Sequence, residues 1–142
     1  MTDPDDWRDA RSHAAAVHAE ALARRTEAET REARRMITAF LAEAARRGLA
    51  PVPVRARSYD GRHRYRTAVR GWYLRRNETV ALGDDGAFYL LSVAPSLASA
   101  VRGARPEPSD PPIILGKGAR DGESIDLVDA LRIVLGDPGW IP

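Results

Sequence analysis

The sequence has 142 residues, of which 44% are hydrophobic and 30% charged, as is typical of a single soluble domain with a modest core. It contains no cysteine, which excludes disulfides, thiolate metal sites and cysteine nucleophiles, and no apolar run approaches the roughly 20 residues that span a bilayer. The formal net charge is only +2, but residues 55–76 carry eight arginines and a single acidic residue, Asp60.

The first predicted element is a helix over residues 4–47. Asp3 can cap its N-terminus, Pro4 suits the first helical position, and Gly48 can end it in the left-handed conformation. At ~1.5 Å per residue this helix is about 66 Å long, whereas a compact chain of this length is roughly 37 Å across. An unbroken helix must therefore extend beyond its own domain or pack on another chain.

A seam of mostly small residues follows one side of this predicted helix, at alternating spacings of four and three. Such a sustained heptad spacing is typical of helices that pair, and small seam residues allow two helices to approach closely. The seam residues are Ser12, Ala16, Ala19, Ala23, Thr26, Thr30, Ala33, Ile37, Phe40 and Ala44.

The seam residues are small at first and become larger toward the C-terminal end of the helix. This change predicts that the chain has two parts. Residues 1–32 are expected to form an overhanging arm that pairs antiparallel with a second copy, as a coiled-coil homodimer. Residues 33–142 are expected to form the globular domain, with residues 33–47 docked on its sheet. A single solvated helix is the alternative, because alanine is the best helix former. The residues predicted to make the self-association are Ala16, Ala19, Leu22, Ala23, Thr26 and Thr30.

From residue 51 onward, short alternating runs between turn residues predict an antiparallel meander of four or five strands. An Asp-Gly pair at residues 60–61 and a Gly-Asp-Asp-Gly run at residues 83–86 mark the hairpin turns. Gly71 can host a bulge within the second strand. The expected strands are residues 52–57, 62–70 continued by 72–74, 79–82 and 87–93.

The remaining third of the chain predicts shorter elements. The loop 116–124 is rich in glycine, but Gly118 follows Lys117 where a P-loop has serine or threonine, so a simple connection is expected. With these elements the sequence predicts an α+β fold with a long N-terminal helix, an antiparallel sheet and a short C-terminal helix. The shorter elements are a helical turn from 95 to 103, an extended proline-rich connector at 103–112, an edge strand at 113–115 and a helix at 126–135 capped by Asp126.

The arginines of the first two strands are expected to share one face of the sheet. Val52, Val54 and Ala56 of the first strand and Tyr65, Thr67 and Val69 of the second are expected to face the core, and alternation then places the neighbouring arginines on the other side. Several cations on one face can displace counterions from a nucleic acid, and a tyrosine there can stack on a base. The alternative is a solvated face, or one paired internally with acids such as Glu78, Asp84 and Asp85. The predicted outer face comprises Arg55, Arg57, Arg62, Arg64, Arg66, Arg70 and, beyond the bulge at Gly71, Tyr73.

The sequence offers no catalytic constellation, and it predicts neither a metal site nor a cofactor. His63 lies in the basic strand and would act as an acid or base only in a small metal-independent ribonuclease. The sequence favours instead a non-enzymatic cytoplasmic module that self-associates through its helix and binds a polyanion, with nucleic acid as the favoured ligand. A protein–protein adaptor without a nucleic-acid role and the ribonuclease are the two alternatives.

Overall fold

A computed structural model of the chain describes residues 3–117 and 123–142, so the middle of the glycine-rich loop lies outside the described residues. The chain has an α+β fold with a long N-terminal helix, a mostly antiparallel sheet and a short C-terminal helix, which confirms the predicted fold class. Within the described ranges, no helix combines the length and apolar character that crossing a membrane requires.

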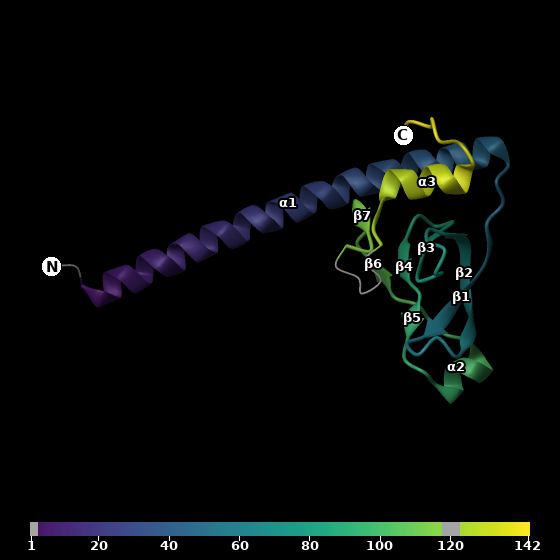
Figure 1. Cartoon of the computed structure of the whole chain (residues 1–142), viewed down its shortest axis with the longest axis horizontal. Coiled ribbons are helices and arrows are strands. Elements are labelled where there is room, and N and C mark those ends of the chain that lie inside the picture. Colours follow the sequence, from purple (N-terminus) through teal and green to yellow (C-terminus); the bar gives the residue numbers. More distant parts are fainter. Residues whose placement is uncertain (1–2, 118–122) are drawn as a thin grey trace.

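Helix α1 (Pro4–Arg47) is unbroken and ends at the predicted residues. The Asp5 N–H donates to the Asp3 carboxylate at 3.1 Å, and Gly48 closes the other end with a φ of 68°. Residues 4–29 are all exposed, and Figure 1 shows this half of the helix projecting away from the rest of the molecule. The residues of α1 that are buried are the last four of the seam, Ala33, Ile37, Phe40 and Ala44.

The main sheet has six strands in the order β5-β1-β2-β3-β4-β6. Neighbouring strands are antiparallel except β1 and β5, which are parallel. Leu91 alone separates β4 from β5, so the chain bends there and the sheet curls back to β1. The single strand predicted over residues 87–93 is therefore two strands. The strands are β1 (Val52–Ser58), β2 (Arg64–Tyr73), β3 (Val80–Gly83), β4 (Phe88–Leu90), β5 (Ser92–Val93) and β6 (Pro108–Ser109).

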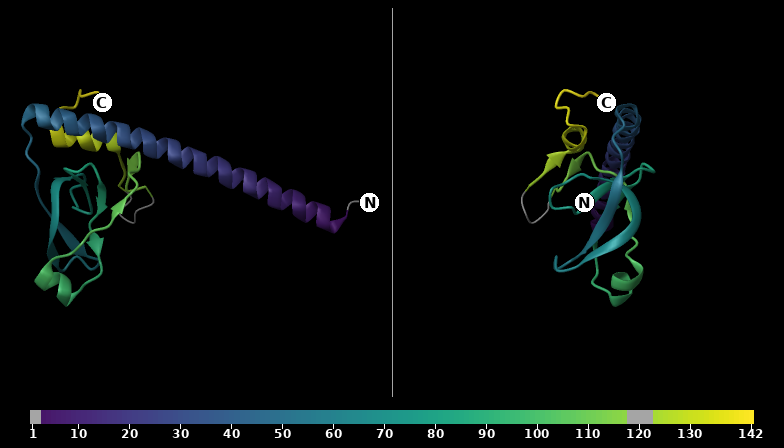
Figure 2. Two further views of the ribbon diagram at one scale, coloured as in Figure 1. Left: turned by 180° about the vertical axis from the view of Figure 1, so that it is seen from behind. Right: turned by 90° about the vertical axis from the view of Figure 1, so that its right-hand side faces the viewer.

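The largest core cluster lies where α1 and α3 (Leu127–Leu135) cover one face of the sheet. Figure 2 shows the two helices side by side above the strands. The Phe40 ring meets the Trp72 ring edge-on, with centroids 5.2 Å apart, and meets Trp140 in the same way at 6.5 Å. The base of α1 is thus fixed by α3 and the C-terminal tail as well as by the sheet on which it was predicted to dock.

The proline-rich connector, which the sequence predicts to be extended and mobile, is paired with the sheet over Pro108–Ser109. Pro108 and Ser109 form β6 beside β4, and the Asp110 carboxylate pairs with Arg34 of α1 at 2.7 Å. The connector therefore ties the sheet to the base of the helix.

Two further predictions about the C-terminal half had different outcomes. The short helix α2 (Leu97–Arg102) forms where a helical turn was predicted, with Ser96 as its N-cap. The predicted edge strand does not join the main sheet, because β7 (Ile114–Leu115) pairs with β8 (Ile125–Asp126) in a separate two-stranded sheet. The partner segment immediately precedes α3, so this pairing sets where α3 begins.

Candidate nucleic-acid interface

The arginines of β1 and β2 lie directly opposite one another. Arg55 pairs across the strands with Arg66, and Arg57 pairs with Arg64. Val54, Ala56 and Tyr65, which alternate with them, are buried as predicted, whereas Val52, predicted to face the core, is 45% exposed. Arg62 lies in the turn ahead of β2, and Arg70 lies further along β2 opposite Pro53. We refer to these six side chains, Arg55, Arg57, Arg62, Arg64, Arg66 and Arg70, as the arginine surface.

Most arginines of this surface are held by hydrogen bonds, but few of their charges are neutralised. Glu78 is the one carboxylate within residues 3–117 and 123–142 that pairs with any of them. In the same ranges the Arg55 and Arg62 side chains have no hydrogen-bond or ion-pair partner. The side-chain bonds run from Arg57 to the Asn77 carbonyl at 3.2 Å, from Arg64 to the Glu78 carboxylate, from Arg66 to the Val101 carbonyl at 3.2 Å and from Arg70 to the Pro51 carbonyl at 3.3 Å.

Of the three acids considered as internal partners, Glu78 pairs with Arg64, whereas Asp85 is engaged elsewhere. The Asp85 carboxylate accepts from the Tyr89 hydroxyl at 2.8 Å and from the Ala87 N–H at 2.9 Å, and it raises the pKa of Tyr89. Internal pairing of the arginine surface with acids is therefore limited, within the described residues, to the ion pair between Arg64 and Glu78. The arginine surface keeps a large positive excess.

Tyr73 does not belong to this surface, so its predicted position is wrong. Its ring packs against the buried cluster of Val54, Ala81 and Leu91, and its hydroxyl accepts the Arg55 backbone N–H at 2.9 Å.

The error came from placing the bulge at Gly71. Pairing with β3 is continuous there, and the register shift lies between Pro53 and Arg55. Trp72 is buried because α1 and α3 cover its face, so no change of face is needed. Glycine is required at position 71 because a Cβ would overlap the Leu82 carbonyl.

His63 is exposed, and its ring stacks on Tyr65 with centroids 6.2 Å apart and an interplanar angle of 19°. The nearby Asp60 carboxylate accepts hydrogen bonds within the turn between β1 and β2. It accepts from the Ser58 hydroxyl at 2.5 Å and the Arg62 N–H at 3.0 Å, and these two bonds hold the pKa of Asp60 below its usual value. A carboxylate held in its charged form is a poor general acid, so Asp60 gives His63 no proton-donating partner.

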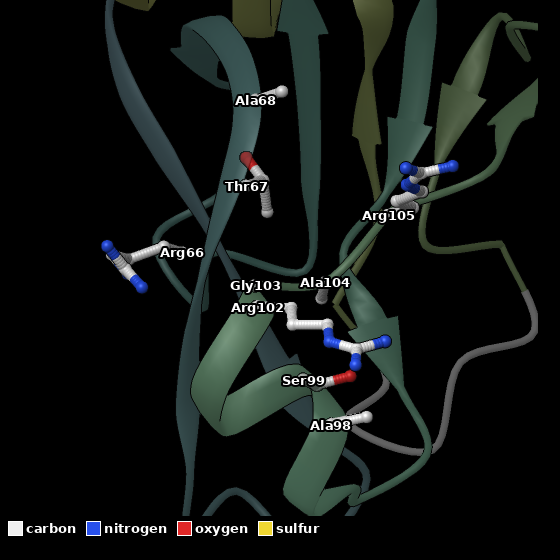
Figure 3. A pocket seen from close by; sticks show the side chains of 9 residues that line it. All are labelled: Arg66, Thr67, Ala68, Ala98, Ser99, Arg102, Gly103, Ala104 and Arg105. Carbon is white, nitrogen blue, oxygen red and sulfur yellow. The ribbon is translucent and has the colours of Figure 1, made fainter.

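A cavity that the sequence did not predict lies beside the arginine surface. It has a volume of about 710 Å³ and lies between β2, α2 and residues 103–105. Figure 3 shows the side chains of Arg66, Arg102 and Arg105 pointing in different directions around it. Arg102 and Arg105 are distant from β2 in sequence. Hydrogen bonds between the two segments bring them together, among them the bond from the Ala104 N–H to the Arg66 carbonyl at 2.7 Å and the bond from the Arg66 side chain to the Val101 carbonyl at 3.2 Å.

The residues predicted for self-association all lie on the projecting half of α1. They are exposed except for Thr30, which is partly covered. Three large apolar side chains of this half are also exposed, namely Trp7 at 59%, Val17 at 49% and Leu22 at 47%. Arg11 places its guanidinium 5.1 Å from the centroid of the Trp7 ring, and all three side chains remain about half exposed.

Metal chemistry has no support in the described residues, where no three histidine or acidic side chains come together as metal ligands. The arrangement instead presents cations, an adjacent cavity and an uncovered helix, all of which are features of binding. Searches of protein-family models, curated proteins and solved structures gave no match to this chain.

Proposed function

We propose that this protein is a non-enzymatic cytoplasmic module that binds nucleic acid through the arginine surface and associates with a second copy through the projecting half of α1. The ligand-binding part is carried by the two cross-strand pairs, Arg55–Arg66 and Arg57–Arg64. Like charges directly opposite one another destabilise a strand pair. Glu78 already relieves part of this repulsion at Arg64, whereas no carboxylate of the described residues pairs with Arg55 or Arg66. A bound polyanion would remove the remaining repulsion by placing phosphates between the guanidinium groups.

The energetics of a polyanion favour this proposal over a small anionic ligand. Each phosphate that an arginine contacts releases condensed counterions, so affinity grows with the number of contacts and falls steeply with salt. The four paired arginines lie on one strand pair, where successive residues on one face repeat every two positions. Such a row follows a phosphate backbone better than it encloses a single ion.

A protein partner is the second candidate, and α2 supports it. Leu97 and Val101 are 88% and 74% exposed and lie four residues apart, hence on the same side of the helix. Adjacent exposed apolar side chains are typical of contact surfaces between proteins. This adaptor reading predicts binding that changes little with salt.

The experiment is a salt titration of binding to fluorescent RNA and DNA oligonucleotides. We compare the double variant Arg55→Gln/Arg66→Gln with Arg24→Gln/Arg25→Gln, which removes the same charge from exposed positions on α1. The first is expected to lower the slope of log K against log salt by about 2 and the affinity about tenfold or more. The second should have little effect on the slope. Because Arg24 and Arg25 lie in the basic segment of the proposed helix pair, the two variants are compared after sedimentation has shown that they have the same mass. Absence of affinity at low salt for every oligonucleotide would refute the nucleic-acid proposal.

Charge distribution supports the self-association part of the proposal. Residues 3–9 contain four aspartates and one arginine, a net charge of −3, whereas residues 24–35 contain five arginines and three glutamates, a net charge of +2. Antiparallel pairing of two copies brings these opposite charges together, but parallel pairing sets like charges side by side. The small seam residues Ala16, Ala19 and Ala23 would then lie at the centre of the pair.

A further inference from the structure

The cavity between β2 and α2 has walls that the fold holds in place. The Ser96 N–H, at the start of α2, donates to the Tyr65 hydroxyl at 3.2 Å, and the Ala104 N–H, beyond its end, donates to the Arg66 carbonyl at 2.7 Å. Gly103 turns the chain with a φ of 87°, and a Cβ there would lie 2.8 Å from the Arg66 carbonyl oxygen. Both ends of α2 are therefore fixed to β2.

Helix α2 itself buries none of its residues, so it adds little to the core. Figures 1 and 2 show it at the end of the sheet opposite α1. Its clearest structural consequence is the hollow that it encloses with β2. A helix anchored at both ends without burying a side chain is better explained by that hollow than by stability.

The side chains inside the cavity are small and uncharged, and arginine side chains lie around it. Ala68, Ala98 and Ala104 line the cavity together with hydroxyl groups from β2 and α2, and none of the described lining residues is acidic. Within residues 3–117 and 123–142, neither the Arg102 nor the Arg105 side chain has a hydrogen-bond or ion-pair partner. In Figure 3 the guanidinium groups of Arg66, Arg102 and Arg105 point in different directions.

We propose that this cavity receives one unstacked base of a single-stranded nucleic acid while Arg66, Arg102 and Arg105 contact the flanking phosphates. This inference rests on the proposed nucleic-acid function. The volume of about 710 Å³ lies within the range of about 300–1,000 Å³ that is usual for small-molecule sites. The planar guanidinium groups can also stack on the base.

The cavity also predicts a preference between kinds of nucleic acid. A single strand can insert a base freely, whereas a duplex must first unpair and unstack one. Arg66 belongs both to the cavity and to the cross-strand pair with Arg55, so one strand can run from the arginine surface into the cavity. We therefore expect single strands to bind at least about tenfold more tightly than duplexes of the same length.

The test measures binding of a single-stranded oligonucleotide and its duplex to the unaltered chain and to two variants of α2. Ala98→Trp fills the cavity, and Ala100→Trp places the same side chain at an exposed position of α2 outside the lining. Filling the cavity is expected to weaken single-strand binding about tenfold and to leave duplex binding unchanged. The control variant should bind both forms like the unaltered chain.

A second pair of variants tests the charges. Arg102→Gln/Arg105→Gln should reduce single-strand affinity by about tenfold, more than Arg24→Gln/Arg25→Gln, which removes the same charge elsewhere. Equal binding of single strand and duplex, or no effect of Ala98→Trp, would overturn the cavity proposal while leaving the arginine surface intact. No binding of either form at low salt would overturn both proposals together.

Discussion

The two halves of α1 share one helix and one seam but have opposite surroundings. Near the C-terminal end, Ala33, Ile37 and Phe40 are 0–3% exposed, whereas Ala16 and Ala19, at equivalent seam positions in the other half, are exposed. The spacing of the seam therefore defines a packing face without specifying what covers it. Side-chain size makes the difference, because only the bulky residues near the C-terminal end bury enough area to hold the helix on its own domain.

The largest expected difference in stability between the two halves of α1 comes from truncating one large side chain in each half. Phe40→Ala should lower the free energy of unfolding by about 3–5 kcal/mol, because it leaves a cavity against the rings of Trp72 and Trp140. Leu22→Ala, in the exposed half, should change it by less than about 0.5 kcal/mol. Urea unfolding at low protein concentration, followed by circular dichroism, measures both. Equal losses would show that the projecting half also contributes to the monomer core.

Removal of the projecting half tests whether its seam is used between molecules. A chain lacking residues 1–30 should retain a folded sheet, since residues 4–29 are exposed, but its mass in sedimentation should fall from dimer to monomer. Ala19→Glu, which places a charge on the seam, should have the same effect, and Ala21→Glu, off the seam, should not. An intact chain that sediments as a monomer at high micromolar concentration would disprove self-pairing.

Local signals predicted the ends of α1, but they could not give the long-range pairings of the strands. Asp3 and Gly48 mark both ends of the helix, and strand alternation identified the face of Arg55 and Arg66. The parallel contact of β5 with β1 and the addition of β6 to β4 depend on where the chain bends, and no local residue pattern encodes that.

The candidate site shows the same division between local and long-range information. Tyr73 was assigned to the wrong face because a glycine was interpreted as a bulge, although Gly71 is needed for close approach of β3. Arg102 and Arg105 were not predicted because their proximity to Arg66 depends on hydrogen bonds between segments that are distant in sequence. A close approach and a bulge call for the same residue type, so only the sheet register distinguishes them.

The smallest expected effect concerns the charges at the docked end of α1. Arg46 and then Arg47 hold the pKa of Glu43 at about 2, below its ordinary value of 4.5, and Arg47 also lowers the pKa of Asp137 beyond α3. Because the pKa of Glu43 is lower in the folded chain than in the unfolded chain, the ionised Glu43 carboxylate stabilises the fold. This stabilisation is present above about pH 4.5 and is lost as the pH falls toward 2.

Melting temperatures at pH 6 and pH 3 should therefore differ less for Glu43→Gln than for the unaltered chain, because the variant lacks the carboxylate whose charge is lost. Glu20→Gln, on the projecting half, removes a carboxylate that has no ion pair in the described part of the chain and should leave the pH dependence unchanged. If both variants behave alike, the ion pairs of Glu43 do not fasten the helix. Packing around Phe40 would then account for the whole difference between the docked and projecting halves.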